Sequence, residues 1–218
     1  MMKQYSALII LLLLASFSLS LLRLESPSYI SRDGARDYLV AHYIVAHGEK
    51  PLLGPRSGTG IINSPLYFYL LAGFLKIKDS VLFLGIINIF SHITTIFLIY
   101  LIAKSLFNPF KAIVASLFYS LIPTMLGHTE FIIYQPYFVQ PFAYLALLLL
   151  IRSYQKNNLK IAFLSLIILC LAGVLYNSAF VWLPVFLIPI FLMIRRKKHK
   201  AKFYLIACFA IILSTSVF

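Results

Sequence analysis

The chain has 218 residues, of which 61% are hydrophobic and only 11% charged, and its formal net charge is +13. Soluble globular domains are about half apolar and about a quarter charged, so this composition excludes an ordinary soluble domain. The apolar residues form long runs, which are typical of membrane helices. The sequence therefore predicts an all-α, polytopic integral membrane protein, because a backbone in lipid must satisfy its hydrogen bonds within each helix.

The basic residues lie in short patches between the apolar runs. That distribution is typical of cytoplasmic loops and argues against a nucleic-acid-binding surface. The two cysteines, Cys170 and Cys208, both lie inside apolar runs. We interpret them as packing residues and expect neither a disulfide nor a metal pair.

The apolar runs predict the topology. They cover, in approximate bounds, residues 6–22, 65–77, 81–103, 112–127, 138–151, 161–176, 178–194 and 203–218. The run 65–77 is too short to cross a hydrocarbon core of about 30 Å at about 1.5 Å per residue. If this run lies in the interface and the N-terminus is inside, every later basic gap is cytoplasmic, as the positive-inside rule favours. We therefore predict about seven transmembrane helices, with extracytoplasmic loops at 23–80 and 128–140.

Both ends of the chain leave alternatives open. Lys3, the Leu-rich run after it and the small residues near 16–20 also fit a signal peptide, although the later spans favour a retained anchor. The last run reaches Phe218 without a flanking charge. We therefore expect residues 1–218 to form a single membrane-embedded module at the N-terminal end of a longer protein.

The first loop concentrates the ionisable groups. Four of the six acidic residues lie there: Glu25, Asp33, Asp37 and Glu49. Ser31 or Asp33 can cap a helix that ends at Gly48. Asp33, Arg36 and Asp37 then share one face of its first turn. The apolar side of this helix is formed by Leu39, Val40, Tyr43, Ile44 and Ala46, which predicts an amphipathic helix on the membrane surface.

The first turn offers the groups that proton abstraction needs. The helix N-terminus and Arg36 both favour an ionised carboxylate. An ionised aspartate can act as a general base toward a hydroxyl. Asp33 and Asp37 are therefore candidate bases. The plainer interpretation is a solvated helix start with an ordinary ion pair, in which Asp37 only orients Arg36.

The residues after this helix predict a loop and a second short helix. Glycines and prolines between Lys50 and Gly60 indicate irregular structure. Arg56 and Lys50 can face a phosphate, although the segment also fits a plain connector. Asn63-Ser64-Pro65 begins the second helix, which contains Tyr67, and aromatic residues at this depth are typical interfacial anchors.

The order of these motifs resembles a known group of enzymes. The chain has one span, an Asp-x-x-Arg turn at Asp33, a Lys-Pro-Leu-Leu-Gly-Pro loop at 50–55 and a Ser-Pro-Leu-Tyr-Phe-Tyr helix start at 64–69. This resembles the GT-C membrane glycosyltransferases of the dolichyl-phosphate-mannose protein mannosyltransferase and aminoarabinose transferase kind. The resemblance implies an enzyme of the cell membrane whose active site is extracytoplasmic. It implies a polyprenyl-phosphate sugar donor, a lipid, glycan or protein acceptor and contact with membrane lipids. Attack opposite the leaving phosphate would invert the anomeric carbon, and the charge pattern gives no reason to expect a nucleic-acid partner.

The resemblance also assigns roles to residues. Asp33 matches the first-loop catalytic aspartate, and Asp37 is the competing base. The expected substrate-binding residues are Arg36, Arg56, Asn63, Tyr67, Glu130 and Gln135. The chain departs from the pattern at Asn63-Ser64, where relatives have His-Pro, at Gln135, where many have Asp, and at Gly34, where some have Glu. These departures leave the sugar and acceptor open, and they count against a metal site built on a first-loop His or Glu.

We expect no resident metal or other cofactor, with a divalent cation left open. Two rival functions remain. A transporter or flippase of lipid-linked substrates would place polar groups near the bilayer midplane, where the spans hold few, among them Asn88 and His92. A non-catalytic membrane subunit would tolerate the loss of Asp33, whereas an enzyme would not.

Overall fold

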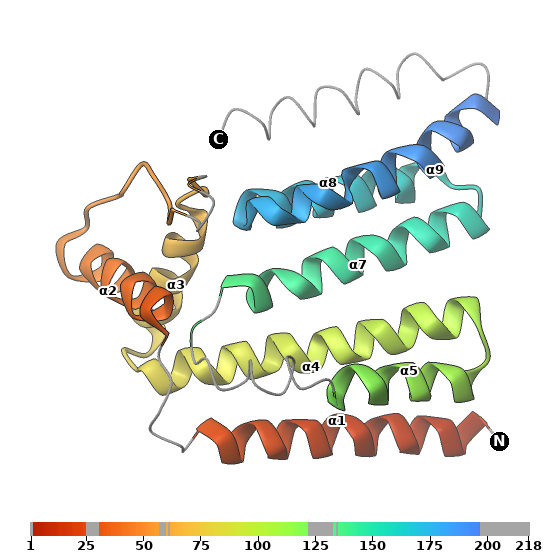
Figure 1. The fold of residues 1–218 in the computed structure, drawn as a ribbon, viewed down its shortest axis with the longest axis horizontal. Helices are drawn as coiled ribbons and strands as arrows, with labels where there is room; N and C mark the ends of the chain where they lie inside the picture. Colours follow the sequence, from red (N-terminus) through yellow and green to blue (C-terminus); the bar gives the residue numbers. More distant parts are fainter. Residues whose placement is uncertain are drawn as a thin grey trace. The chain divides into compact units, whose positions relative to one another are not determined.

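The computed structural model describes residues 2–24, 31–56, 60, 62–121, 133 and 135–196 (Figure 1). Regular structure in these residues is helical, apart from an isolated antiparallel bridge between Arg56 and Ile62. The helices are α1 (Met2–Leu24), α2 (Arg32–His47), α3 (Leu66–Ile77), α4 (Val81–Leu106), α5 (Pro109–Leu121), α7 (Gln135–Gln155), α8 (Leu159–Leu175), the short 3-10 helix η1 (Asn177–Trp182) and α9 (Leu183–Arg196). The all-α prediction is confirmed.

Several helices are suited to a membrane. Within the described part of the chain, four helical segments are long and apolar enough to cross it: Gln4–Leu22, Val81–Leu106, Gln135–Gln155 and Asn177–Arg195. Helices α5 and α8 coincide with two further predicted spans but have only 13 and 17 residues. The predicted run 203–218 lies outside the described residues. The protein is an integral membrane protein, and the count of seven spans stays a prediction.

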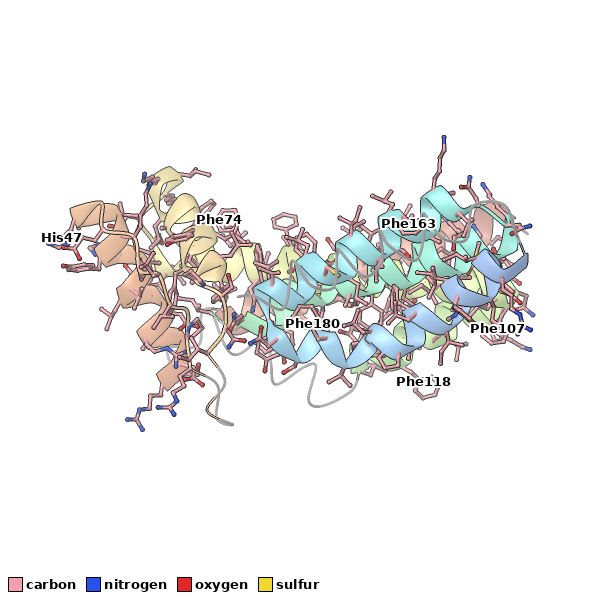
Figure 2. The ribbon with its side chains drawn as sticks, turned by 90° about the horizontal axis from the view of Figure 1, so that it is seen from above. His47, Phe74, Phe107, Phe118, Phe163 and Phe180 are labelled. Carbon is pink, nitrogen blue, oxygen red and sulfur yellow. The ribbon has the colours of Figure 1, made fainter. Side chains whose placement is uncertain are left out.

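Contacts divide the chain into two compact units, residues 1–141 and 142–218. In the first unit, α1, α4 and α5 run side by side (Figure 1). They enclose a small core formed by Ile9, Tyr100, Ala103 and Ala112. Exposed aromatic rings such as Phe118 point outward from these helices (Figure 2). Such outward apolar side chains are expected where helices face lipid instead of water.

The first unit also contains α2 and α3, which pack against each other near the start of α4 (Figure 1). Helix α3 has 12 residues, in agreement with the prediction that the run 65–77 is too short to span. A second apolar cluster joins these helices, and its buried members are Ala41, Ile44, Tyr67, Phe68, Leu71, Ala72, Leu75, Leu84 and Ile133. This cluster holds α2, and with it the predicted site, against α3.

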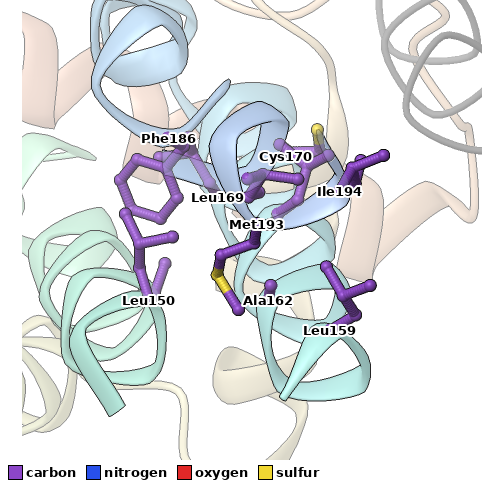
Figure 3. Packing of buried hydrophobic residues seen from close by; sticks show 11 residues of the cluster. Leu150, Leu159, Ala162, Leu169, Cys170, Phe186, Met193 and Ile194 are labelled. Atoms are coloured by element: carbon purple, nitrogen blue, oxygen red, sulfur yellow. The ribbon is translucent and has the colours of Figure 1, made fainter. Parts of the chain in front are cut away.

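The second unit is built from the remainder of α7 with α8, η1 and α9. Its buried cluster includes Leu150, Leu169, Phe186 and Met193 (Figure 3). Cys170 is buried in the same cluster, as expected for a packing residue. Pro189 lies inside α9, where the missing backbone N–H removes one helical hydrogen bond.

Candidate functional site

The first turn of α2 is held by its N-cap. The side-chain oxygen of Ser31 accepts a hydrogen bond of 3.0 Å from the backbone N–H of Gly34. This contact satisfies one of the N–H groups that lack a partner within the helix. The helix ends at Gly48, whose φ of 73° is in the left-handed region and whose N–H bonds to the carbonyl of Ile44. Both boundaries follow the predicted cap chemistry.

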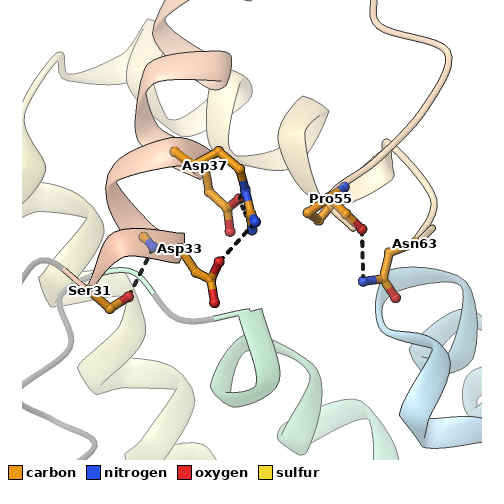
Figure 4. A network of polar contacts seen from close by, with 7 residues as sticks. Ser31, Asp33, Asp37, Pro55 and Asn63 are labelled. Atoms are coloured by element: carbon orange, nitrogen blue, oxygen red, sulfur yellow. Dashed lines mark hydrogen bonds and ion pairs between the residues drawn. The ribbon is translucent and has the colours of Figure 1, made fainter. Parts of the chain in front are cut away.

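Arg36 links the two candidate bases. Its Nη1 donates to Oδ1 of Asp33 at 2.9 Å, and its Nε and Nη2 donate to Oδ1 of Asp37 at 2.9 and 2.8 Å (Figure 4). The guanidinium therefore lies between two carboxylates of one helical turn. The predicted shared face of the three residues is confirmed.

The two carboxylates lie in different environments. The side chain of Asp33 is 70% exposed, whereas that of Asp37 is 3% exposed. Burial raises the pKa of Asp37 to about 6, although the hydrogen bonds and charge of Arg36 act in the opposite direction. Arg36 thus favours the ionised carboxylate of Asp37, as expected, but desolvation outweighs this effect on the pKa, so the carboxylate is protonated once the pH falls below about 6.

Asp37 belongs to the face of α2 that packs inward. The buried residues of this helix are Gly34, Asp37, Ala41 and Ile44, whose spacing of three and four places them on one stripe. Leu39 and Tyr43 of the predicted apolar side are exposed. The Asp33 carboxylate is thus open to solvent, while the buried Asp37 carboxylate holds Arg36.

The loop after α2 is fastened by Asn63. The Asn63 side chain is buried and donates from Nδ2 to the carbonyl of Pro55 at 3.1 Å (Figure 4). The backbone N–H of Asn63 bonds to the same carbonyl at 3.0 Å, and Gly54 N–H bonds to the carbonyl of Asn63 at 3.0 Å. These hydrogen bonds show that Asn63 stabilises the loop. Gly54 also packs closely here, because a Cβ atom at this position would stand 2.2 Å from the carbonyl oxygen of Ser64.

The other predicted substrate-binding residues fall in three places. Arg56 is exposed, and its Nε donates to the carbonyl of Gly60 at 3.3 Å. Tyr67 is 2% exposed, and burial, followed by the charge of Asp37, raises the pKa of its phenol well above the usual range. Gln135 is buried at the start of α7. Glu130 lies outside the described residues.

Sequence reasoning missed an interaction that joins α2 to the α3–α4 connection. His42 Nε2 lies 3.2 Å from Oδ2 of Asp79, and the hydroxyl of Tyr38 donates to Oδ1 of Asp79 at 3.4 Å. Both contacts are exposed, so they add little to stability. A separation of 37 residues gives no local signal for this pair. Among the described residues, no three His, Cys, Asp or Glu side chains gather in a way that would hold a metal ion.

Comparison with known proteins places the chain in a family. Residues 62–218 match the model of the family described as dolichyl-phosphate-mannose-protein mannosyltransferase. The match covers well over half of the chain. The chain belongs to this family. Comparison with curated proteins and with solved structures finds no significant match.

Membership of the dolichyl-phosphate-mannose-protein mannosyltransferase family makes the chain a membrane glycosyltransferase of the mannosyltransferase type in general terms. The match begins at residue 62, so Tyr67 and Gln135 lie within it. Asp33, Arg36 and Asp37 precede it, and their roles depend on the geometry of α2. The resemblance inferred from the motifs is confirmed at the level of the family.

Proposed function

We propose that this chain transfers a sugar from a polyprenyl-phosphate-linked donor to an acceptor hydroxyl, with Asp33 as the general base. The observation that carries the proposal is the exposed Asp33 carboxylate, which one hydrogen bond to Arg36 orients and most of whose surface stays open to an acceptor. Family membership supports glycosyl transfer. The acceptor is a lipid, glycan or protein hydroxyl.

The proposed step is an in-line displacement at the anomeric carbon. The acceptor oxygen forms the new bond to that carbon, and its proton passes to the carboxylate of Asp33. The bond from the anomeric carbon to the phosphate oxygen breaks, and the phosphate leaves on its lipid. Attack opposite the leaving group inverts the anomeric configuration. Phosphate is a good leaving group, so the residues mainly activate the acceptor and stabilise separating charge.

Arginines near Asp33 are suited to the leaving phosphate. Arg36 is oriented by Asp37, and its side chain remains 39% exposed. Arg56 is exposed in the loop that Asn63 fastens. Guanidinium groups bind phosphate oxygens through paired N–H donors and stabilise developing charge. We therefore assign Arg36 and Arg56 to the donor phosphate, and we assign Asp37 to the positioning of Arg36.

Matched aspartate variants test the proposed base. Asp33→Asn keeps the size of the side chain but removes its basicity, and we expect transfer to fall by about 100-fold or more. Asp79→Asn is the control. Asp79 is another exposed acid of the first unit, and it contacts His42 and Tyr38. The assay uses labelled polyprenyl-phosphate sugars. Normal transfer by Asp33→Asn would contradict the proposal and favour a non-catalytic subunit.

We further propose that the two loops, 23–80 and 128–140, lie on the extracytoplasmic face of the cell membrane. Leu52 is exposed in the first loop, and Lys156 is exposed in the turn between α7 and α8. In a chain without its native cysteines, Leu52→Cys should react with an impermeant maleimide in intact cells. Lys156→Cys should react only after permeabilisation. The opposite pattern would place Asp33 in the cytosol and exclude the proposed topology.

One observation favours the second candidate, movement of a lipid-linked substrate across the membrane. Asn88, His92 and Thr95 are buried on one face of α4, and the ring of His92 stacks on Tyr119 at 5.9 Å. Buried ionisable groups in membrane helices are often functional. Transport should depend on His92 and tolerate Asp33→Asn, whereas glycosyl transfer should depend on Asp33. Comparing His92→Ala with Asp33→Asn therefore separates the two functions.

A further inference from the structure

Gly34 is in direct contact with the backbone of Ile133, which lies two residues before α7 begins. A Cβ atom built at Gly34 would stand 2.5 Å from the carbonyl oxygen of Ile133 and 3.3 Å from the Ile133 Cβ. Cβ atoms essentially never approach another heavy atom to 2.5 Å, and here that atom belongs to backbone. Any side chain at position 34 would therefore move α2 and Ile133 apart.

Packing restricts the movement of Ile133. Its side chain is 2% exposed and belongs to the apolar cluster that contains Ala41, Ile44 and Tyr67. Protein interiors are close-packed, so a displacement at one point is passed to the neighbouring groups. Added bulk at Gly34 would thus shift the first turn of α2, disturb this cluster, or both.

Two neighbours therefore fix the first turn of α2 at Gly34. Ser31 accepts the N–H of Gly34, and the backbone of Ile133 lies against the position that a Cβ atom of Gly34 would take. Asp33 precedes Gly34 directly, and Arg36 follows two residues later in the same turn. The position of the proposed base depends on how closely Ile133 seats against this turn.

We propose that Gly34 is a positioning residue: its lack of a side chain lets the backbone of Ile133 pack directly against the first turn of α2, and this packing sets where Asp33 and Arg36 meet the substrates. This inference rests on the proposed function, because it concerns the turn that carries the proposed base. It assigns no contact between Gly34 and substrate. It adds a role for Gly34 and Ile133 that family membership does not specify.

A matched pair of glycine variants tests the contact itself. Gly34→Ala adds one methyl group against Ile133, whereas Gly73→Ala adds one in α3, where no heavy atom lies within 4 Å. Both substitutions favour the helix in the same way. Hydrogen exchange is measured on the full chain in lipid nanodiscs. We expect Gly34→Ala to raise exchange about tenfold or more in peptides covering 31–38 and 133–140, and Gly73→Ala to leave both unchanged. Equal behaviour of the two variants would overturn the proposal.

A second variant approaches the contact from the other side. Ile133→Ala shortens the buried Ile133 side chain without changing α2. We expect faster exchange in 31–38 as well as in 133–140. If Gly34→Ala raises exchange throughout α4 and α5 as well, that variant is globally unfolded. Ile133→Ala then decides whether the contact between Gly34 and Ile133 holds the first turn of α2. Unchanged exchange at 31–38 in Ile133→Ala would overturn the proposal.

Kinetics separate a positioning role from a merely structural one. Small misplacements of catalytic groups can cost about 100-fold in rate. For Gly34→Ala we expect kcat to fall by about 10- to 100-fold while KM for the donor changes less than about threefold. An unchanged kcat in a protein with altered exchange would overturn the positioning role. If Asp33→Asn retains full activity, the proposed function fails, whereas the exchange result still decides whether the packing of Ile133 against Gly34 holds the first turn of α2.

Discussion

Arg36 donates two hydrogen bonds to a single oxygen of Asp37, from Nε at 2.9 Å and from Nη2 at 2.8 Å. The Asp37 carboxylate is buried and the Arg36 side chain is partly exposed, so Asp37 holds Arg36 in place. Hydrogen bonds to charged groups are stronger than neutral ones, and leaving one partner buried without the other is costly. The two aspartates therefore differ in environment, because the Asp37 carboxylate is buried against Arg36 and the Asp33 carboxylate is exposed.

Removing the charge of Asp37 should impair transfer without removing the base. In Asp37→Asn the side-chain oxygen is a weaker acceptor, so Arg36 loses the stronger of its two anchors. We expect a loss of about 10- to 100-fold in kcat, which corresponds to one charge-assisted hydrogen bond of about 1.5–3 kcal/mol. Steady-state kinetics on Asp37→Asn and the control Asp79→Asn check this. Equal activity of the two variants would show that Asp37 does not position Arg36.

The free energy of unfolding should fall as the pH rises toward the pKa of Asp37 in the folded protein. The pKa of Asp37 is about 6 in the folded protein and 3.8 in its ordinary environment. The folded state therefore binds this proton more tightly, and the free energy of unfolding decreases between about pH 4 and pH 6, by about 3 kcal/mol at most. Thermal unfolding across this range measures it. Asp37→Asn should lose this part of the pH dependence, and an unaltered slope would contradict the assignment.

The loop that carries Arg56 should depend on Asn63. Asn63→Ala removes the buried donor to the Pro55 carbonyl, and we expect a loss of about 1–3 kcal/mol in the free energy of unfolding. Trypsin should then cleave faster after Arg56, because the loop opens more often. Leu53→Ala is the control, since Leu53 is exposed in the same loop. Cleavage at equal rates in both variants would exclude a fastening role for Asn63.

In the second unit, Gly173 and Phe180 should be energetically coupled. A Cβ atom at Gly173 would stand 2.4 Å from the Phe180 ring. Gly173→Ala alone combines a helix gain of about 1 kcal/mol with an overpacking cost of about 1–3 kcal/mol, so we expect a neutral or destabilising result. In a Phe180→Ala background the cost disappears, and the same substitution should stabilise by up to about 1 kcal/mol. A double-mutant cycle measures the difference, and additive effects would contradict the contact.

Local chemistry explains most of what could be predicted. Ser31 and Gly48 mark the ends of α2 because capping depends on neighbouring residues, and helical spacing places Arg36 beside both aspartates. Substrate binding by Asn63 stays a prediction, and its amide also donates to the carbonyl of Pro55, eight residues earlier in the chain. No local pattern distinguishes a polar side chain that bonds within a loop from one that binds a ligand. Where Glu130 lies stays open, because it falls outside the described residues.

Composition and the lengths of the apolar runs determined by themselves that this chain is an α-helical membrane protein, since the hydrogen-bonding demand of a backbone in lipid leaves few alternatives. The order of short motifs was enough to indicate its family. The different burial of Asp33 and Asp37, and the seating of Ile133 against Gly34, were decided only by the tertiary structure. Burial depends on which side chains from distant parts of the chain pack against a residue, and helical spacing does not encode that.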